Sequence, residues 1–432
     1  MTTDTFDHLP TEIILAIIED LPDLPSLRNL VHASPACLRV FSYNGAAIME
    51  RIMKTTPIPK QVQAIIRLVA LLRSSACFSR AYPTLDALVT MCTSKDFASI
   101  PRPLGEITLS PRILRGILET MYQLWCLTHS CLQHYIDRCL ALRPSRLLDP
   151  KFRYKPQEHG APWRLRPEGR RVTPKNWGPP SWAEESRVSR AFWRVQLLYD
   201  LRKAASENRL GWSDQEVERL GTMGAWEFGV SPEVEKEQVM TVTEYVEELR
   251  KERRARKDLI ASATSFWELF PFPEGEQGEI DLTATAACDD DTDTICQPFD
   301  LPWPIKKVVE PYGNRRKTWQ SPNETDFLNR MTTGQIFHRN LTCLYASPLR
   351  YVSFDPFRRL GFAIWDRERL TKLKLLEHHP LPISFALAQR GDIFFRWRSI
   401  LREEELEIHD RIAEERRREA LKRLGLKDPL GE

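Results

Sequence analysis

The chain has 432 residues, of which 42% are hydrophobic, and its 62 Lys and Arg against 59 Asp and Glu give a net charge of +3. This balance is typical of a globular protein and excludes both a disordered chain and an overall strongly cationic polyanion binder. No apolar run reaches the length of a membrane span, and nine scattered cysteines do not form a disulfide framework, so we expect a soluble protein of the cytoplasm or nucleus with reduced thiols and no membrane partner.

The first predicted helix, residues 12–20, is apolar over an unusually wide face. At about 100° per residue, Ile13, Ile17, Ile14 and Ile18 spread over about 140° of the helix circumference. An ordinary surface helix buries a stripe of about 100°. The wide face must therefore be covered, either by the chain itself or by another protein.

Helical periodicity dominates the rest of the chain, and runs of alternating β-branched residues are scarce. We therefore expect an all-α fold with little sheet. The pairs Ser34-Pro35, Ser110-Pro111 and Ser231-Pro232 each place an N-cap hydroxyl before a proline at the first helical position. Further helices are predicted over residues 61–73, 111–142, 182–207, 232–257 and 356–376.

Three segments depart from this pattern. Residues 144–182 are rich in proline, tryptophan and basic residues and are predicted to be a long loop. Residues 274–300 contain nine acidic residues and no basic one, which predicts a mobile acidic loop. Residues 398–424 are predicted to be a charged helix, supported by Glu and Arg side chains at four-residue spacing.

The stretch LPTEIILAIIEDLPDLPSLRNLVHASP, residues 9–35, resembles the F-box, with a likeness to the F-box proteins of filamentous fungi. The family pattern is Leu-Pro-x-Glu, an apolar helix, a second Leu-Pro, and then a helix with spaced leucines. One position departs from it: many members end the third helix with a tryptophan, where this chain has Val40 and Phe41.

The resemblance implies a three-helix module over residues 1–50 that binds the Skp-family adaptor and, through it, a cullin in an SCF ubiquitin ligase. A segment of this size cannot build a sufficient core by itself, and an amphipathic helix with a spare apolar face is suited to another protein's groove. Residues 51–432 would then form an irregular helical domain with long loops that recruits an unknown target. The residues expected to contact the adaptor are Leu9, Pro10, Ile13, Ile14, Ile17, Ile18, Leu21, Leu24, Leu27 and Leu30.

In this interpretation the chain is a non-catalytic, substrate-recognition subunit, and it carries no phosphate-binding loop, nucleophile elbow or zinc-protease motif. Three alternatives stay open. The protein could be an F-box-like scaffold outside any ligase, a nucleic-acid-binding protein, or an enzyme without a recognisable motif. In the second case residues 151–177 would supply basic side chains beside aromatic ones for phosphate contact and stacking, although a linker wrapped on the core has the same composition.

Two groups of residues resemble metal sites only by composition, and we expect no metal or cofactor. Asp289, Asp291 and Asp293 have the spacing of a calcium loop but lack its glycine. The other group lies on one predicted helix and points in every direction, whereas a zinc site needs ligands that converge: Cys126, His129, Cys131, His134 and Cys139.

A second, softer resemblance to the same fungal group covers FRRLGFAIWDRERL, residues 357–370. Here Gly361 would allow a close backbone approach, and Asp366 could cap a helix that begins at Arg367. We expect the aromatic residues of this region, Phe362 and Trp365 among them, to pack in the core, the alternative being a groove for the target.

Overall fold

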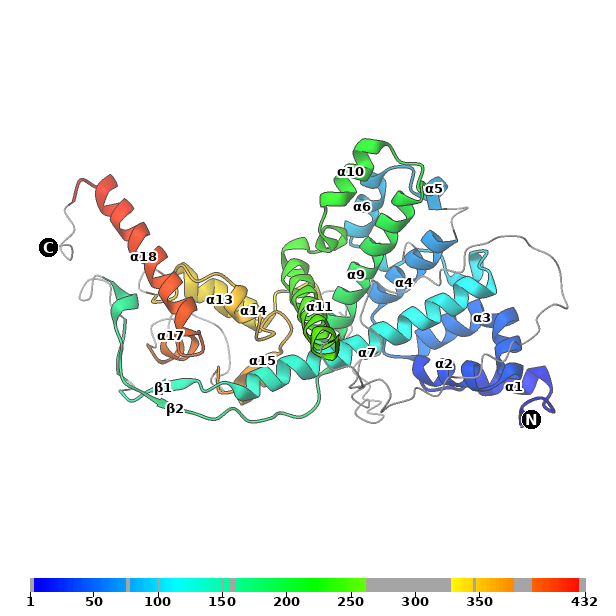
Figure 1. The fold of residues 1–432 in the computed structure, drawn as a ribbon, viewed down its shortest axis with the longest axis horizontal. Helices are drawn as coiled ribbons and strands as arrows, with labels where there is room; N and C mark the ends of the chain where they lie inside the picture. Colours follow the sequence, from blue (N-terminus) through cyan, green and yellow to red (C-terminus); the bar gives the residue numbers. More distant parts are fainter. Residues whose placement is uncertain are drawn as a thin grey trace.

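The fold is all-α with long connections, apart from one two-stranded sheet in the described part of the chain (Figure 1). This confirms the predicted fold class. None of the described helices is long and apolar enough to cross a membrane. The computed structural model describes residues 4–74, 78–99, 101–149, 151–154, 161–261, 328–344, 347–376 and 391–426.

The N-terminal region folds as three consecutive helices, and two of them are capped by side chains. The Asp23 carboxylate accepts a hydrogen bond from the Ser26 amide at 2.8 Å, and the Ser34 hydroxyl accepts one from the Cys37 amide at 3.1 Å. The third helix runs past residue 50, so the predicted module boundary falls inside it. The helices are α1 (Thr11–Glu19), α2 (Leu24–Ala33) and α3 (Pro35–Thr55).

A central group of helices follows, and α7 is the longest helix in the described chain with 31 residues. As predicted from the Ser-Pro pair, the Ser110 hydroxyl caps α7 by accepting a hydrogen bond from the Ile113 amide. The predicted helices 61–73, 111–142, 182–207 and 232–257 are confirmed as α4, α7, α9 and α11. The elements are α4 (Lys60–Arg73), α5 (Phe78–Ala81), α6 (Leu85–Thr93), α7 (Pro111–Ala141), α9 (Trp182–Ser206), α10 (Asp214–Thr222) and α11 (Pro232–Ala261), with 3-10 turns η1 (Phe97–Ser99), η2 (Leu104–Glu106), η3 (Pro162–Arg164) and η4 (Ala225–Phe228).

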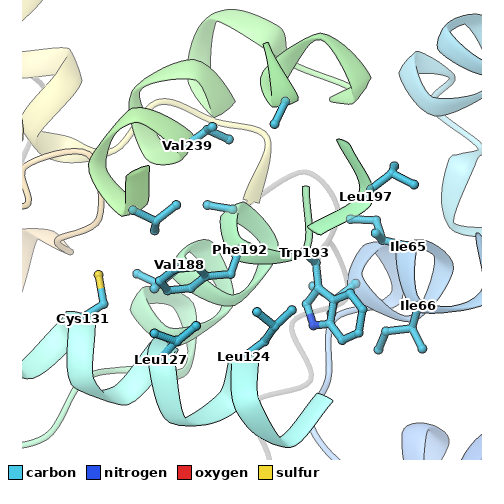
Figure 2. Packing of buried hydrophobic residues seen from close by; sticks show 14 of the residues in the cluster. Ile65, Ile66, Leu124, Leu127, Cys131, Val188, Phe192, Trp193, Leu197 and Val239 are labelled. Carbon is cyan, nitrogen blue, oxygen red and sulfur yellow. The ribbon is translucent and has the colours of Figure 1, made fainter. Parts of the chain in front are cut away.

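Helix α9 lies at the centre of the hydrophobic core, between α4, α7 and α11 (Figure 2). Phe192 and Trp193 of α9 point toward Leu124 and Leu127 of α7 and toward Ile66 of α4. All of these side chains are buried, and the same cluster continues into the N-terminal helices. The first 50 residues therefore share one core with the rest of the chain.

The C-terminal part begins after residue 327 and consists of shorter helices. The single helix predicted over residues 356–376 is wrong, because the chain turns at Gly361, whose φ is +75°, between α14 and α15. The charged helix predicted over 398–424 begins later, at Glu403, because Arg398 ends the preceding helix. The elements are α13 (Thr333–Cys343), α14 (Asp355–Arg358), α15 (Arg367–Lys372), α17 (Gly391–Arg398) and α18 (Glu403–Arg423).

The segment predicted as a loop, residues 144–182, contains the sheet. Strand β1 (Ser145–Leu147) pairs antiparallel with β2 (Gly169–Arg171) in the register Arg146 opposite Arg170. Strand β1 also packs against α17. The predicted acidic loop 274–300, with its calcium-like spacing, lies outside the described residues.

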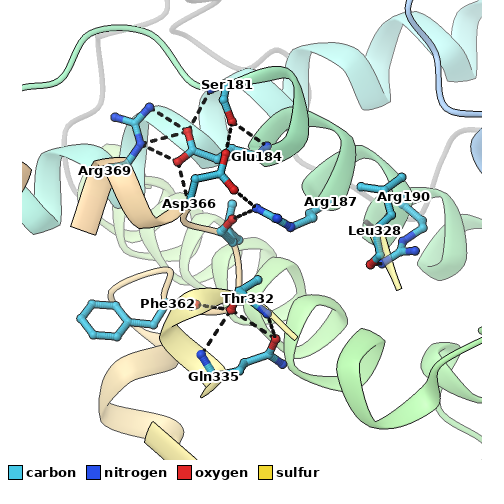
Figure 3. Close-up of polar contacts among 11 residues, drawn as sticks. Ser181, Glu184, Arg187, Arg190, Leu328, Thr332, Gln335, Phe362, Asp366 and Arg369 are labelled. Carbon is cyan, nitrogen blue, oxygen red and sulfur yellow. Dashed lines mark hydrogen bonds and ion pairs between the residues drawn. The ribbon is translucent and has the colours of Figure 1, made fainter. Parts of the chain in front are cut away.

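A buried polar network attaches α15 to the start of α9 (Figure 3). The Arg369 guanidinium donates to both carboxylate oxygens of Glu184, at 2.7–2.9 Å. Beside it, the Asp366 carboxylate accepts hydrogen bonds from Arg187, at 2.7 Å, and from the Ser181 hydroxyl. These contacts join residues about 180 positions apart, so the C-terminal helices are part of the same folded unit.

Candidate docking surface at the N-terminal helices

Helix α1 has one apolar face turned inward and one turned outward. Ile14 and Ile18 are buried and belong to the main core, because α1 packs along α3. Leu9, Ile13 and Ile17 lie at four-residue spacing on the other side and are 39%, 49% and 37% exposed. Half of the wide apolar face predicted from the sequence is therefore covered by the chain, and half is not.

Ion pairs fix α1 on α3 near both of its ends. Asp7 pairs with Arg39 at 2.7 Å, and Glu19 pairs with Arg51. Since Arg39 and Arg51 are both exposed residues of α3, they mark the side of α3 that borders α1. The outward face of α1 is thus held in a fixed orientation.

The segment before α1 is anchored as well. The Asp4 carboxylate accepts hydrogen bonds from the Ala36 amide at 3.0 Å, the Phe6 amide at 3.0 Å and the Ser34 hydroxyl at 2.7 Å. These bonds, that from the Ala36 amide most of all, hold the pKa of Asp4 below its usual value. The Leu9 amide donates a hydrogen bond to the Phe6 carbonyl, and this bond closes a turn directly before α1.

Tyr43 extends this surface, and the sequence reasoning missed it. Its side chain is 89% exposed, and it lies on α3 between Arg39 and Arg51 at four-residue spacing, on the side that borders α1. The spacing of Arg39, Tyr43, Ala47 and Arg51 was readable from the sequence, but it identifies a face only once the two ion pairs are known. Leu9, Pro10, Ile13, Ile17 and Tyr43 are called the α1 surface below.

The other residues expected to contact an adaptor have different positions. Pro10 is exposed, and its carbonyl accepts the first hydrogen bonds of α1. Leu21 and Leu30 are half-buried. Leu24 and Leu27 are buried in the chain's own core, as Ile14 and Ile18 are, so these four present no surface to a partner in this structure.

The α1 surface has an acidic border. Residues 4–27 contain six Asp and Glu and no Lys or Arg. Asp4, Asp7, Glu19 and Asp23 are occupied by the pairs and caps described above, whereas Glu12 and Asp20 are exposed and form no ion pair with a described cation. A partner that covers the apolar side chains would therefore gain from basic groups at its rim.

The cysteines and histidines of α7 serve packing. The Cys139 thiol donates to the Leu360 carbonyl at 3.1 Å, and burial raises the pKa of Cys139 to about 12, so this thiol is unreactive. His134 lies 3.1 Å from Glu248 of α11, and the His129 ring packs edge-on against Trp125. Each side chain thus meets a different neighbour, and no group of potential metal ligands converges among the residues the structure describes.

The segment around Gly361 is structural. A Cβ at Gly361 would lie 2.9 Å from the Trp365 ring, and Trp365 and Phe362 are fully buried, as expected. Asp366 stands at the N-cap of α15, but its carboxylate accepts from Arg187 and the Ser181 hydroxyl instead of capping the helix. Asp366 therefore occupies the predicted N-cap position, but the prediction that its side chain caps α15 is wrong.

Comparisons with protein-family models, with curated proteins and with solved structures found no match to this chain.

Proposed function

We propose that the α1 surface binds the Skp-family adaptor and that the protein is a substrate-recognition subunit of an SCF ubiquitin ligase. The observation that carries the proposal is the exposed pair Ile13 and Ile17 on α1, together with Leu9 just before the helix, while the adjacent face of α1 is anchored to the core. These residues lie within the stretch that resembles the F-box. Isolated exposed apolar residues are common, but two in register on one helix, with a third just before it, suit a helix-binding groove.

In this proposal the protein acts by position and contributes no catalytic residue. The α1 surface would hold the adaptor and, through it, a cullin, while the helices after residue 50 present an unknown target in the cytoplasm or nucleus. Tethering raises the effective concentration of target lysines near the ubiquitin-loaded enzyme, which accelerates transfer without chemistry in this chain. The rigid attachment of α1 to α3 supports such a role, because a fixed anchor preserves the geometry between adaptor and target.

The test replaces Ile13 and Ile17 with Glu and measures binding of the purified Skp adaptor by calorimetry. Full burial of an isoleucine is worth about 1.5–3 kcal/mol, and roughly half of each side chain is still exposed, so losing both contacts costs about 2 kcal/mol before any charge is buried. We expect Kd to rise by about 30-fold or more. The fold should persist, because both residues point outward.

Helix α18 offers a matched control. Ile408 and Ile412 have the same spacing as Ile13 and Ile17 and the same exposures, 49% and 37%. The variant Ile408→Glu/Ile412→Glu should bind the adaptor as the unchanged protein does. Adaptor binding that both double variants retain equally, or that the unchanged protein lacks, would refute the proposal.

A scaffold outside any ligase is separated from this function by a second measurement. If the protein recovered from cells carries the adaptor together with a cullin, it belongs to a ligase, whereas the adaptor alone indicates a scaffold. Point substitutions are better suited to these tests than removal of residues 1–50, because that cut divides α3 and removes buried residues such as Phe41 and Ile48 from the common core.

A further inference from the structure

The β1–β2 hairpin turns one face toward α17 and the other toward solvent. The Leu147 amide donates to the Asp392 carboxylate and the Ser145 amide to the Ser399 hydroxyl, both at 2.8 Å. These backbone bonds hold the edge of β1, and a Cβ at Gly169 would lie 2.2 Å from the Phe395 ring, so the face that carries residue 169 lies against α17. Because side chains alternate along a strand, residues 146 and 170 must stand on the opposite, solvent-facing side.

Two arginines occupy that outer face in direct opposition. Arg146 and Arg170 are cross-strand partners, and both are exposed. Like charges placed directly opposite each other destabilise a sheet. Neither guanidinium forms an ion pair with a carboxylate in the described residues, and the adjacent Arg171 forms none either. The described part of the fold therefore places two cations opposite each other without a paired carboxylate, in a position that weakens the sheet.

The charge around the hairpin is concentrated. Residues 143–175 contain ten Lys and Arg and three Asp and Glu, although the whole chain carries only +3. Some of this charge is neutralised by α18, since Arg164 pairs with Glu414 at 3.0 Å and Arg166 with Asp410 at 2.8 Å. Among the residues that the structure describes, no carboxylate neutralises the arginines on the hairpin itself.

The aromatic residues of this region are not arranged for base stacking. Tyr154 and Trp163 are both buried. Trp177 is 45% exposed, but the Lys372 ammonium lies 4.5 Å from its ring centroid. A nucleic acid would therefore meet charge rather than stacking platforms, which favours contact with a phosphate backbone over capture of unpaired bases.

We propose that the outer face of the β1–β2 hairpin binds the phosphate backbone of a double-stranded nucleic acid, without sequence preference. Paired guanidiniums match phosphate oxygens bidentately, and a duplex supplies closely spaced phosphates. An acidic peptide fits less well. A protein interface needs an apolar core, whereas Leu148 is the single large apolar side chain that the described hairpin exposes. This inference does not depend on the proposed adaptor function.

The experiment measures binding of the full chain to a fluorescent 20-base-pair DNA duplex by anisotropy, at several salt concentrations. The variant Arg146→Gln/Arg170→Gln should bind at least tenfold more weakly at low salt. The slope of log K against log salt should become shallower by about two, since each lost phosphate contact removes about 0.9. Its thermal unfolding should be unchanged or shifted slightly upward, because the opposed charges are gone.

A control of equal charge is Arg102→Gln/Arg115→Gln, which removes two exposed arginines that lie outside the hairpin. This variant should keep both the affinity and the salt slope. Three results would overturn the proposal: no duplex binding at 50 mM salt, equal weakening in both double variants, or binding of polyglutamate as tight as that of the duplex. The last would assign the surface to acidic proteins.

Discussion

The ion pair between Glu184 and Arg369 attaches the C-terminal helices to α9, and Glu184→Gln is the substitution that tests it best. The two side chains are 1% and 3% exposed. Glu184 also accepts hydrogen bonds from the Ser181 amide at 2.9 Å and the Asp366 amide at 3.1 Å, so its buried carboxylate has four donors. Glutamine keeps the shape but removes the charge.

The expected loss in the free energy of unfolding follows from the Arg369 charge, which remains buried in the variant. In Glu184→Gln the Arg369 guanidinium remains buried without a counter-charge, with the amide oxygen of the new glutamine and the carbonyls of Gly178 and Pro179 as acceptors. Removing one member of a buried ion pair typically costs about 3–5 kcal/mol. Replacing both, as in Glu184→Gln/Arg369→Met, removes the stranded charge, so the double variant should be less destabilised than the sum of the single ones by about 2 kcal/mol or more.

Unfolding in urea, followed by tryptophan fluorescence, measures these differences. Trp365, one of twelve tryptophans in the chain, contributes to this signal from the network itself, because the Arg369 guanidinium lies 5.1 Å from its ring centroid. Asp86→Asn is the control: its pair with Arg219 is mostly exposed, and losing it should cost less than about 1 kcal/mol. A cost for Glu184→Gln as small as that of the control, or strict additivity in the double variant, would show that the network does not hold the C-terminal helices.

Two further predictions concern Glu185, which lies beside this network, and Gly169, where the hairpin packs on α17. Burial and the neighbouring Glu184 raise the pKa of Glu185 to about 7, so its contribution to stability is full below about pH 4.5 and is lost as the pH rises through 7. Glu185→Gln should therefore match the unchanged protein at pH 4 and exceed its free energy of unfolding by about 3 kcal/mol at pH 8, in denaturant unfolding measured at both pH values. Gly169→Ala should cost about 1–3 kcal/mol through its clash with Phe395, and adding Phe395→Ala should restore part of the loss in the same assay.

The sequence was a good guide wherever the signal is local. Both ends of α7 agree with the prediction, because a capping serine, a proline at the first turn and a sustained apolar period all act within one segment. Local signals also predicted α9, but not its surroundings. Arg190 and Arg194 of α9 are fully buried beside Glu235 of α11, about 40 residues away, and no periodicity in one segment reveals such a partner.

The features that the sequence did not predict also depend on contacts between distant segments. Strands β1 and β2 are three residues each and contain no β-branched residue, so nothing in them predicts a sheet; Asp392 and Ser399, more than 240 residues later, support β1. The wide apolar face of α1 was visible, but which half stays exposed depends on where α3 lies. Sequence reasoning therefore found the candidate docking helix, and the structure separated Ile13 and Ile17 from Ile14 and Ile18.

Helix α7 has a mechanical consequence. Its length of 31 residues corresponds to about 46 Å. It packs against α2 and α3 on one side, while Arg138 and Cys139 near its far end bond to the carbonyls of Arg359 and Leu360. Because α7 is one continuous helix, it fixes the distance between the N-terminal helices and the segment around α14. A partner bound beside α1 is therefore held at a fixed distance from a partner bound near α14. A kink in the middle of α7 would change that distance and leave both binding surfaces intact.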